Sequence, residues 1–151
     1  MDFSIVIPVF NEEESLRELM ANIKKAFSNI KKTYEVIFID DGSTDKSLDV
    51  LKRIASDNKN IRVLSFRKNI GKSQALTLGF REATGKYIVT PDADLQDDPS
   101  NIMTLYQKMT RNNYDLVTAW RKNRKDSVFK ILSSRLFNTI VVPVLFGLRL
   151  N

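Results

Sequence analysis

Apolar runs rich in β-branched and aromatic residues recur along this chain, and stretches of helical periodicity separate them. The runs lie at residues 3–8, 34–39, 61–66, 86–90 and 114–119. Two of them contain the uninterrupted strings Ile5-Val6-Ile7 and Val36-Ile37-Phe38-Ile39, which are typical of strands buried on both faces. The sequence therefore predicts an α/β fold, with a mostly parallel, open, twisted sheet and helices on both faces.

The first helical segment has the clearest amphipathic pattern. Its apolar side chains recur at helical spacing and would form one face: Leu16, Leu19, Met20, Ile23, Phe27 and Ile30. Asn11 and Glu14 precede this run and predict a capping box. Leu48, Leu51 and Ile54 predict a second helix of the same kind.

The composition fits a globular protein that uses neither cysteine nor histidine. Of the 151 residues, 42% are hydrophobic and 28% are charged, which is enough apolar material for a core. The lack of cysteine excludes disulfides and thiolate chemistry and is consistent with a reducing compartment. The lack of histidine leaves carboxylates, lysine, tyrosine and water to carry any proton transfer.

The sequence gives two indications about location. The first residues, Met1-Asp2-Phe3-Ser4-Ile5, lack the features of a secretory signal, so we expect a cytoplasmic protein. The longest apolar candidate for membrane contact, residues 140–148, contains Pro143 and Gly147 and is shorter than the ~20 residues needed to cross a bilayer.

The net charge of +6 comes from the end of the chain. Residues 1–110 hold 16 basic and 16 acidic side chains, whereas residues 111–151 hold 8 and 2. Such a basic tail could bind nucleic acid, anionic lipid or a phosphorylated substrate, or it could be a solvated helix. Charge alone does not decide between these alternatives.

An acidic stretch follows the fourth apolar run: Thr90-Pro91-Asp92-Ala93-Asp94-Leu95-Gln96-Asp97-Asp98-Pro99. If this stretch is extended, Asp92, Asp94 and Gln96 face one side, and their oxygens suit a hard ion such as Mg²⁺ or Mn²⁺ that holds nucleotide phosphates. The alternative is a surface turn, in which short acidic runs are common. For Asp98, which precedes a proline, we expect a helix N-cap.

Polar clusters also follow the first two apolar runs, at Phe10-Asn11-Glu12 and Asp40-Asp41-Gly42-Ser43-Thr44-Asp45. Ligands of open α/β sheets bind outside the carboxyl ends of the strands, so these clusters and the acidic stretch would share one edge. Crowded carboxylates repel each other unless a cation or hydrogen-bond donors accept them. The convergence favours a metal and nucleotide site.

Two common nucleotide-binding motifs are absent. Gly71-Lys72-Ser73 resembles the end of a P-loop, but that motif needs a glycine where Phe66 stands. No Gly-x-Gly-x-x-Gly follows the first apolar run, so the dinucleotide fingerprint is missing as well.

Four motifs, in this order and at these spacings, together resemble the family 2 inverting glycosyltransferases of the GT-A fold, which is Rossmann-like: Ile7-Pro8-Val9-Phe10-Asn11-Glu12, Ile39-Asp40-Asp41-Gly42-Ser43-Thr44-Asp45, Asn69-Ile70-Gly71-Lys72 and Asp92-Ala93-Asp94. The string from Asp92 to Pro99 is similar to the polyprenyl-phosphate branch, which includes dolichyl-phosphate mannose synthase and bacterial undecaprenyl-phosphate sugar transferases. The resemblance implies transfer of a sugar, with inversion, from a UDP- or GDP-sugar to a polyprenyl phosphate.

The resemblance also implies roles for individual residues. The residues that would bind the nucleotide are Pro8, Val9, Glu12, Asp41, Lys72, Asp92 and Ala93. Among them, Glu12 would lie near the ribose and Asp41 would read the base edge. Asp94 and Gln96 would ligate the Mg²⁺ or Mn²⁺ that bridges the two phosphates.

We expect Asp92, Asp94 and Arg121 to serve catalysis, because the departing nucleoside diphosphate develops negative charge that a metal and nearby cations stabilise. The residues that would hold the acceptor phosphate are Lys130, Ser134 and Arg135. A phosphate monoester has a second pKa of about 6 and is largely ionised near neutral pH, so it needs no strong base. A saccharide hydroxyl acceptor would need a carboxylate base that the sequence does not reveal.

We expect residues 1–120 to form the nucleotide-sugar-binding domain and residues 121–151 to begin the acceptor side. Apolar residues of the tail recur at helical spacing beside basic ones: Phe129, Leu132, Leu136, Phe137 and Ile140. This pattern suits an interfacial helix at a membrane surface; a helix facing the core is the alternative.

Members of the family continue beyond the equivalent of Asn151, so the resemblance predicts the donor-binding part of a longer protein. A module that binds nucleotide and metal without transfer is therefore a second hypothesis. Nucleic-acid binding is disfavoured because no nucleic-acid fold signature is present. The sugar, the choice between UDP and GDP, and any homo-oligomer stay open.

Overall fold

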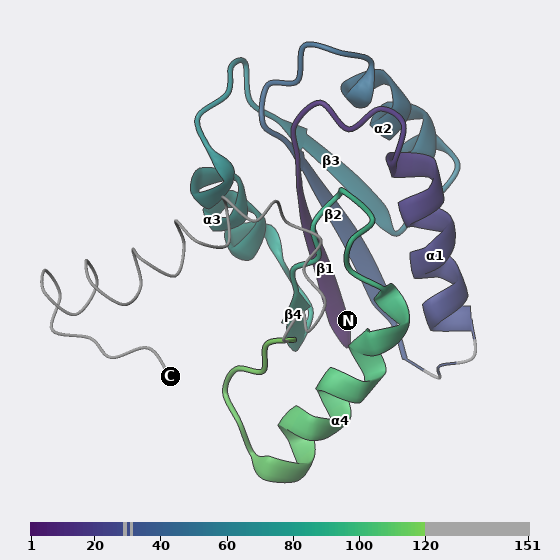
Figure 1. Ribbon diagram of the computed structural model, residues 1–151, viewed down its shortest axis with the longest axis vertical. Coiled ribbons are helices and arrows are strands. Elements are labelled where there is room, and N and C mark those ends of the chain that lie inside the picture. Colours follow the sequence, from purple (N-terminus) through teal and green to yellow (C-terminus); the bar gives the residue numbers. More distant parts are fainter. Residues whose placement is uncertain (29, 31, 120–151) are drawn as a thin grey trace, which may run out of the picture. The chain divides into compact units, whose positions relative to one another are not determined.

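The computed structural model describes residues 1–28, 30 and 32–119 (Figure 1). The chain divides into two compact units, Met1–Val117 and Thr118–Asn151, and the described elements belong to the first. In chain order they are β1 (Phe3–Val9), α1 (Leu16–Ser28), β2 (Tyr34–Asp40), α2 (Ser47–Ser56), β3 (Ile61–Ser65), α3 (Lys72–Glu82), β4 (Tyr87–Val89), the 3₁₀ helix η1 (Pro99–Asn101) and α4 (Ile102–Asn112).

The four described strands form one parallel sheet in the order β3-β2-β1-β4. Ile5, in the middle of β1, pairs with Val36 of β2 on one side and with Val89 of β4 on the other. The predicted parallel α/β fold is confirmed. Because β2 and β3 follow on one side of β1 and β4 on the other, the order of strands reverses at β1. Ligands of open α/β sheets bind at such a reversal.

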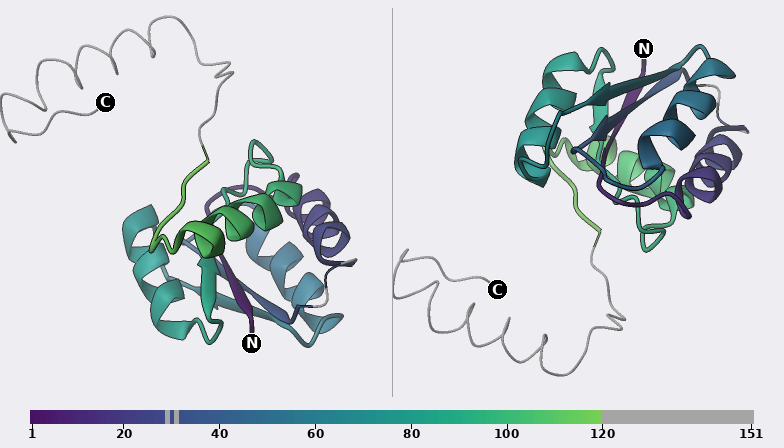
Figure 2. Two further views of the ribbon diagram at one scale, coloured as in Figure 1. Left: turned by 90° about the horizontal axis from the view of Figure 1, so that it is seen from below. Right: turned by 90° about the horizontal axis from the view of Figure 1, so that it is seen from above.

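Helices cover both faces of the sheet (Figure 2). On one face, Phe3, Ile5 and Ile7 of β1 pack in a core shared with α1, α2 and α4. On the other face, Val6 packs against Ala75 of α3. Successive residues of β1 therefore enter opposite cores, as the period of a strand requires, which explains its uninterrupted apolar run.

Two expectations about helix starts had different outcomes. Asp98 caps η1 as predicted, since its carboxylate accepts a hydrogen bond from the Ser100 N–H at 2.9 Å. The predicted capping box of Asn11 and Glu14 was wrong. The Asn11 amide oxygen accepts instead from the Thr44 N–H at 2.8 Å, so the loop after β2 and not the start of α1 supplies its donor.

The fifth strand predicted at residues 114–119 was also wrong, since the structure shows no strand over this segment. Leu116 is 78% exposed and Tyr114 is 52% exposed. Residues with β propensity form a strand only where a partner edge offers hydrogen bonds, and composition alone does not show that edge. None of the helices in the described part of the chain is long and apolar enough to cross a membrane.

A buried carboxylate joins the strands at the end of the sheet opposite the ligand edge. Glu35 of β2 accepts hydrogen bonds from the Ser4 hydroxyl at 2.6 Å and from the Thr84 N–H and hydroxyl at 2.8 and 2.7 Å. Arg62 of β3 lies 3.2 Å from its other oxygen. Burial opposes ionisation, but the hydrogen bonds and Arg62 outweigh it and lower the pKa of Glu35 from 4.5 to about 2.

We predict that Glu35→Gln destabilises the fold by about 2 kcal/mol at neutral pH, because a hydrogen-bonded buried charge and its ion pair with Arg62 are lost. Because the folded pKa lies below the unfolded one, this stabilisation is present above about pH 4.5 and is lost as the pH falls towards 2. Urea unfolding of the parent protein and the variant across this range should show the difference shrinking. An equal difference at about pH 3 and about pH 7 would contradict the assignment. Glu14→Gln, at an exposed position, is the control.

Candidate functional site

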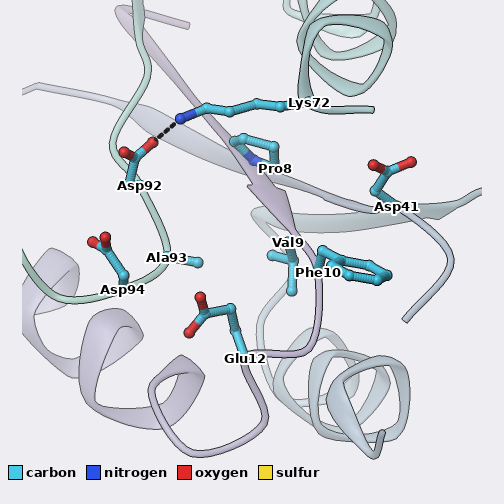
Figure 3. Close-up of a pocket in the computed structure, with 9 residues that line it drawn as sticks. All are labelled: Pro8, Val9, Phe10, Glu12, Asp41, Lys72, Asp92, Ala93 and Asp94. Carbon is cyan, nitrogen blue, oxygen red and sulfur yellow. Dashed lines mark hydrogen bonds and ion pairs between the residues drawn. The ribbon is translucent and has the colours of Figure 1, made fainter. Parts of the chain in front are cut away.

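A pocket of about 220 Å³ lies at the carboxyl end of β1, between the loops that follow β1, β2 and β4. Figure 3 shows the side chains that line it, which are Pro8, Val9, Phe10, Glu12, Asp41, Lys72, Asp92, Ala93 and Asp94. The structure thus brings together all seven residues that the sequence predicted for nucleotide binding. The pocket lies where the strand order reverses, as expected for a ligand site in an open α/β sheet.

Hydrogen bonds between the loops after β1 and β2 hold Glu12 at the pocket. The Glu12 N–H donates to the buried Ser47 hydroxyl at 2.8 Å, and the Glu13 N–H donates to the Asp45 carboxylate at 3.2 Å. In the other direction, the Lys46 N–H donates to the Glu13 carboxylate at 2.7 Å. Burial opposes ionisation of Asp45, but hydrogen bonds from Ser47 and Glu13 outweigh it and lower its pKa. The Asp45 carboxylate therefore stays ionised well below neutral pH, and the contact between the two loops persists there.

The two aspartates at the end of β2 are both engaged by the polypeptide. Asp40 accepts from the Ser65 hydroxyl at 2.8 Å. Asp41 is 3% exposed, and its two oxygens accept from the N–H groups of Ile70 and Gly71, each at 2.9 Å. These contacts join the loop after β2 to the loop before α3.

The acidic loop after β4 is not extended, so the condition under which Asp92, Asp94 and Gln96 would face one side is not met. The Asp94 carboxylate accepts from the Gln96 N–H at 3.0 Å, and Leu95 has a positive φ of 60°. Aspartate side chains commonly form such turns by accepting from the backbone two residues on. As a result, Asp94 lines the pocket, whereas Gln96 is not among the lining residues.

Lys72 and Asp92 form an ion pair at the pocket (Figure 3). Lys72 is the first residue of α3, and its side chain reaches across to the loop after β4. The lysine side chain is 57% exposed and the aspartate side chain 31%. An exposed pair of this kind contributes little to stability, so the pair places a cation at the pocket without anchoring the fold.

The carboxylates of Glu12, Asp92 and Asp94 lie on the same side of the pocket (Figure 3). Within the described residues, no three carboxylate, histidine or cysteine side chains are close enough to hold a metal ion by themselves. Mg²⁺ is usually held by one or two carboxylates together with substrate phosphates and water. The oxygen donors present therefore fit an ion that binds together with a nucleotide.

Phe10 lines the pocket and is 44% exposed, although the sequence analysis gave it no role. Its position directly after the first strand, beside Glu12, was the signal that could have indicated it. Four of the predicted residues, Arg121, Lys130, Ser134 and Arg135, lie outside the described part of the chain, so the catalytic cation and the acceptor site stay predictions.

The comparison with protein families gives one match over nearly the whole chain. A family model described as glycosyl transferase family 2 matches residues 4–149. The chain belongs to this family. The resemblance carried by the four sequence motifs is thereby confirmed.

Among curated relatives of this family 2 chain, an undecaprenyl-phosphate 4-deoxy-4-formamido-L-arabinose transferase of Pectobacterium carotovorum is 41% identical over 139 residues, which are 91% of this chain and 42% of the relative. A dodecaprenyl-phosphate galacturonate synthase of Rhizobium johnstonii is 36% identical over 130 residues, which are 85% of this chain and 38% of the relative. The chain thus spans about two fifths of the length of these relatives.

Two solved structures resemble the chain. The mannosyltransferase PcManGT of Pyrobaculum calidifontis, in complex with GDP-Man and Mn²⁺, is 28% identical with a TM-score of 0.55 and aligns with 61% of this chain and 27% of its own. Residues 1–349 of TarS from S. aureus give a TM-score of 0.66 at 23% identity, over 83% of this chain and 38% of that one. The second likeness concerns the fold alone. Together they confirm the GT-A type of α/β fold.

The two glycines with positive φ near the pocket differ in their surroundings. Gly42 has a φ of 68°, and a Cβ there would lie 2.3 Å from the backbone carbonyl carbon of Lys68. Gly71 has a φ of 105°, but a Cβ there would have no neighbour within 4 Å.

We predict that Gly42→Ala lowers the free energy of unfolding by about 3 kcal/mol and Gly71→Ala by only about 1 kcal/mol, as measured by urea unfolding. Equal costs would contradict the close approach of the two loops.

Proposed function

We propose that this chain is the donor-binding part of an inverting, metal-dependent glycosyltransferase that moves a sugar from a nucleotide-diphosphate sugar to a polyprenyl phosphate. The observation that carries the proposal is the pocket itself, which gathers Glu12, Asp41, Lys72, Asp92 and Asp94 at the reversal of strand order. The two curated relatives, both named for transfer to a polyprenyl phosphate, support this choice of acceptor.

The pocket offers a distinct surface to each part of a nucleotide donor. The exposed ring of Phe10 could stack on the base, and the neighbouring Glu12 could accept from the ribose hydroxyls. Lys72 would neutralise a diphosphate. Asp92 and Asp94 are the side chains that would hold a divalent metal beside it, and Mn²⁺ together with GDP-Man in PcManGT supports this arrangement. Gln96 stays a predicted further ligand.

The bound metal would supply Lewis-acid stabilisation of the departing diphosphate. In the proposed transfer, an oxygen of the acceptor phosphate attacks C1 of the sugar from the face opposite the diphosphate. The new C1–O bond forms as the bond from C1 to the diphosphate oxygen breaks, and the electron pair leaves with the nucleoside diphosphate. Lys72, and Arg121 as predicted from the sequence, would stabilise that negative charge.

An ionised phosphate acceptor makes this chemistry compatible with the composition of the chain. A phosphate monoester with a second pKa of about 6 has already lost its proton near neutral pH, so no general base is needed. The chain contains no histidine that could serve as one. Lys130, Ser134 and Arg135 are proposed to hold the acceptor phosphate. The basic tail that contains them would bring the protein to the cytoplasmic surface of a membrane.

The donor site can be tested by calorimetry with UDP and GDP, each with and without Mn²⁺. We expect one of the two nucleotides to bind only with the metal and Asp94→Ala to lower its affinity at least tenfold, because a hard carboxylate ligand is lost. Asp57→Asn, at an exposed position at the end of α2, should bind like the parent protein. Failure of both nucleotides to bind folded protein would refute the proposal.

Transfer itself requires a separate assay, because the chain spans only about two fifths of its relatives. The second candidate function, a module that binds nucleotide and metal without transfer, predicts nucleotide binding with no glycosylated product. Incubation with a labelled donor and undecaprenyl phosphate distinguishes the two. A labelled lipid product that Asp94→Ala abolishes supports transfer by this chain, and binding without product supports the module.

A further inference from the structure

We propose that Asn11 is a positioning residue that shapes the nucleoside end of the pocket, because it holds Phe10 and Glu12 in place through the loop after β2. The inference rests on the proposed function of the pocket, in which Phe10 meets the base and Glu12 meets the ribose. Asn11 stands between these two lining residues in the sequence but does not itself line the pocket. Its effect on a bound nucleotide is therefore indirect.

Asn11 exchanges two hydrogen bonds with the loop after β2. Its backbone N–H donates to the Ser43 hydroxyl at 3.0 Å, and its amide oxygen accepts from the Thr44 N–H at 2.8 Å. Ser43 is itself held, because its N–H donates to the Asp40 carboxylate at 3.3 Å. In each direction a side chain of one loop binds the backbone of the other, so a shift of either loop breaks both contacts.

The backbone of Asn11 adopts a turn that few side chains tolerate. Its φ of 55° lies in the left-handed region, which asparagine enters more readily than most other residues. The two neighbouring side chains leave this turn in different directions (Figure 3). The Phe10 ring lies on the side of Asp41, whereas the Glu12 carboxylate points towards Asp94. Asparagine thus both permits the turn and supplies the oxygen that fixes it to the neighbouring loop.

The N–H groups of the next two residues extend this contact. Those of Glu12 and Glu13 donate to side chains at the start of α2 and in the loop before it, so three consecutive N–H groups bind one segment. Of the three residues, Asn11 is the one that adjoins both Phe10 and Glu12. The contact at Asn11 therefore bears most directly on the pocket.

The Phe10 ring depends on the backbone for its place. The residue is 44% exposed, so packing in the core does not fix it. The turn at Asn11 and its hydrogen bonds then decide where the ring stands. A change at Asn11 should accordingly weaken binding of the nucleoside and leave the contribution of the second phosphate unchanged.

The test uses Asn11→Gly, which keeps the left-handed backbone but removes the oxygen that accepts from Thr44. Calorimetry with Mn²⁺ is run with UMP and UDP, and with GMP and GDP. For the preferred base, we expect the affinities for the mono- and diphosphate to fall by the same factor, about tenfold, because both share the nucleoside. Lys72→Met should instead lower the affinity for the diphosphate more than that for the monophosphate.

Asn113→Gly is the matched control. Asn113 follows α4, is exposed and has a φ of 53°, so the same substitution is made in the same backbone conformation outside the pocket. It should change no affinity by more than about twofold. Asn11→Asp tests the hydrogen bond itself. Aspartate offers an oxygen at the same position and tolerates the same turn, so this variant should bind within about twofold of the parent protein.

A coupled comparison shows through which residues Asn11 acts. The double variant Phe10→Leu/Glu12→Gln removes both proposed nucleoside contacts. Adding Asn11→Gly to it should lower the affinity for UDP or GDP by less than about twofold, because contacts that are already removed cannot be misplaced.

Ser43→Ala reaches the same contact from the other loop. It removes the oxygen that accepts from the Asn11 N–H, so it should lower the affinities for the mono- and diphosphate equally, by about threefold. It decides the question if Asn11→Gly does not fold.

Four results would overturn the inference. They are parent-like binding by both Asn11→Gly and Ser43→Ala, a loss confined to the diphosphate, an equal loss in Asn113→Gly, and no recovery in Asn11→Asp. A full tenfold loss on adding Asn11→Gly to the double variant would likewise show that Asn11 acts independently of Phe10 and Glu12. A parent protein that binds neither diphosphate would instead refute the proposed function, so the two failures are distinguishable.

Discussion

The structure depends on the pairing of β1 on both of its edges. β1 is hydrogen-bonded to β2 on one side and to β4 on the other, and its side chains enter two separate cores. In the sheet, β2 and β3 lie on one side of β1, and β4 lies on the other side. The loops that follow β1 and β4 therefore leave the carboxyl ends of these two strands on either side of a crevice. The pocket is a consequence of that strand order.

Carboxylates that accept from backbone N–H groups build the walls of the pocket. Asp45 and Glu13 join the loops after β1 and β2, Asp41 joins the loop after β2 to the start of α3, and Asp94 closes the turn after β4. A chain without histidine or cysteine thus uses aspartate and glutamate both to shape the site and to offer ligands to a metal. A carboxylate can do both because each oxygen has two lone pairs.

Much of the site could be predicted from the sequence because parallel strands place their carboxyl ends at one edge. That rule was enough to place Glu12, Asp41 and Asp92 at one edge of the sheet, whereas Pro8 was assigned to the pocket through the family resemblance. The rule says nothing about hydrogen bonds between loops. It could not show that Asn11 bonds to the neighbouring loop or that the acidic stretch turns at Leu95, because these depend on donors that only the folded chain brings near.

The sequence by itself determined the α/β class, the parallel strands and the edge at which the polar clusters meet, because apolar periodicity and strand polarity are local properties of the chain. The same local information indicated the N-cap at Asp98. Only the tertiary structure decided that Asp41 is buried against the loop before α3, that Lys72 pairs with Asp92, and that residues 114–119 do not form a strand. Each of these depends on which distant segment lies alongside, and spacing along a sequence does not contain that information.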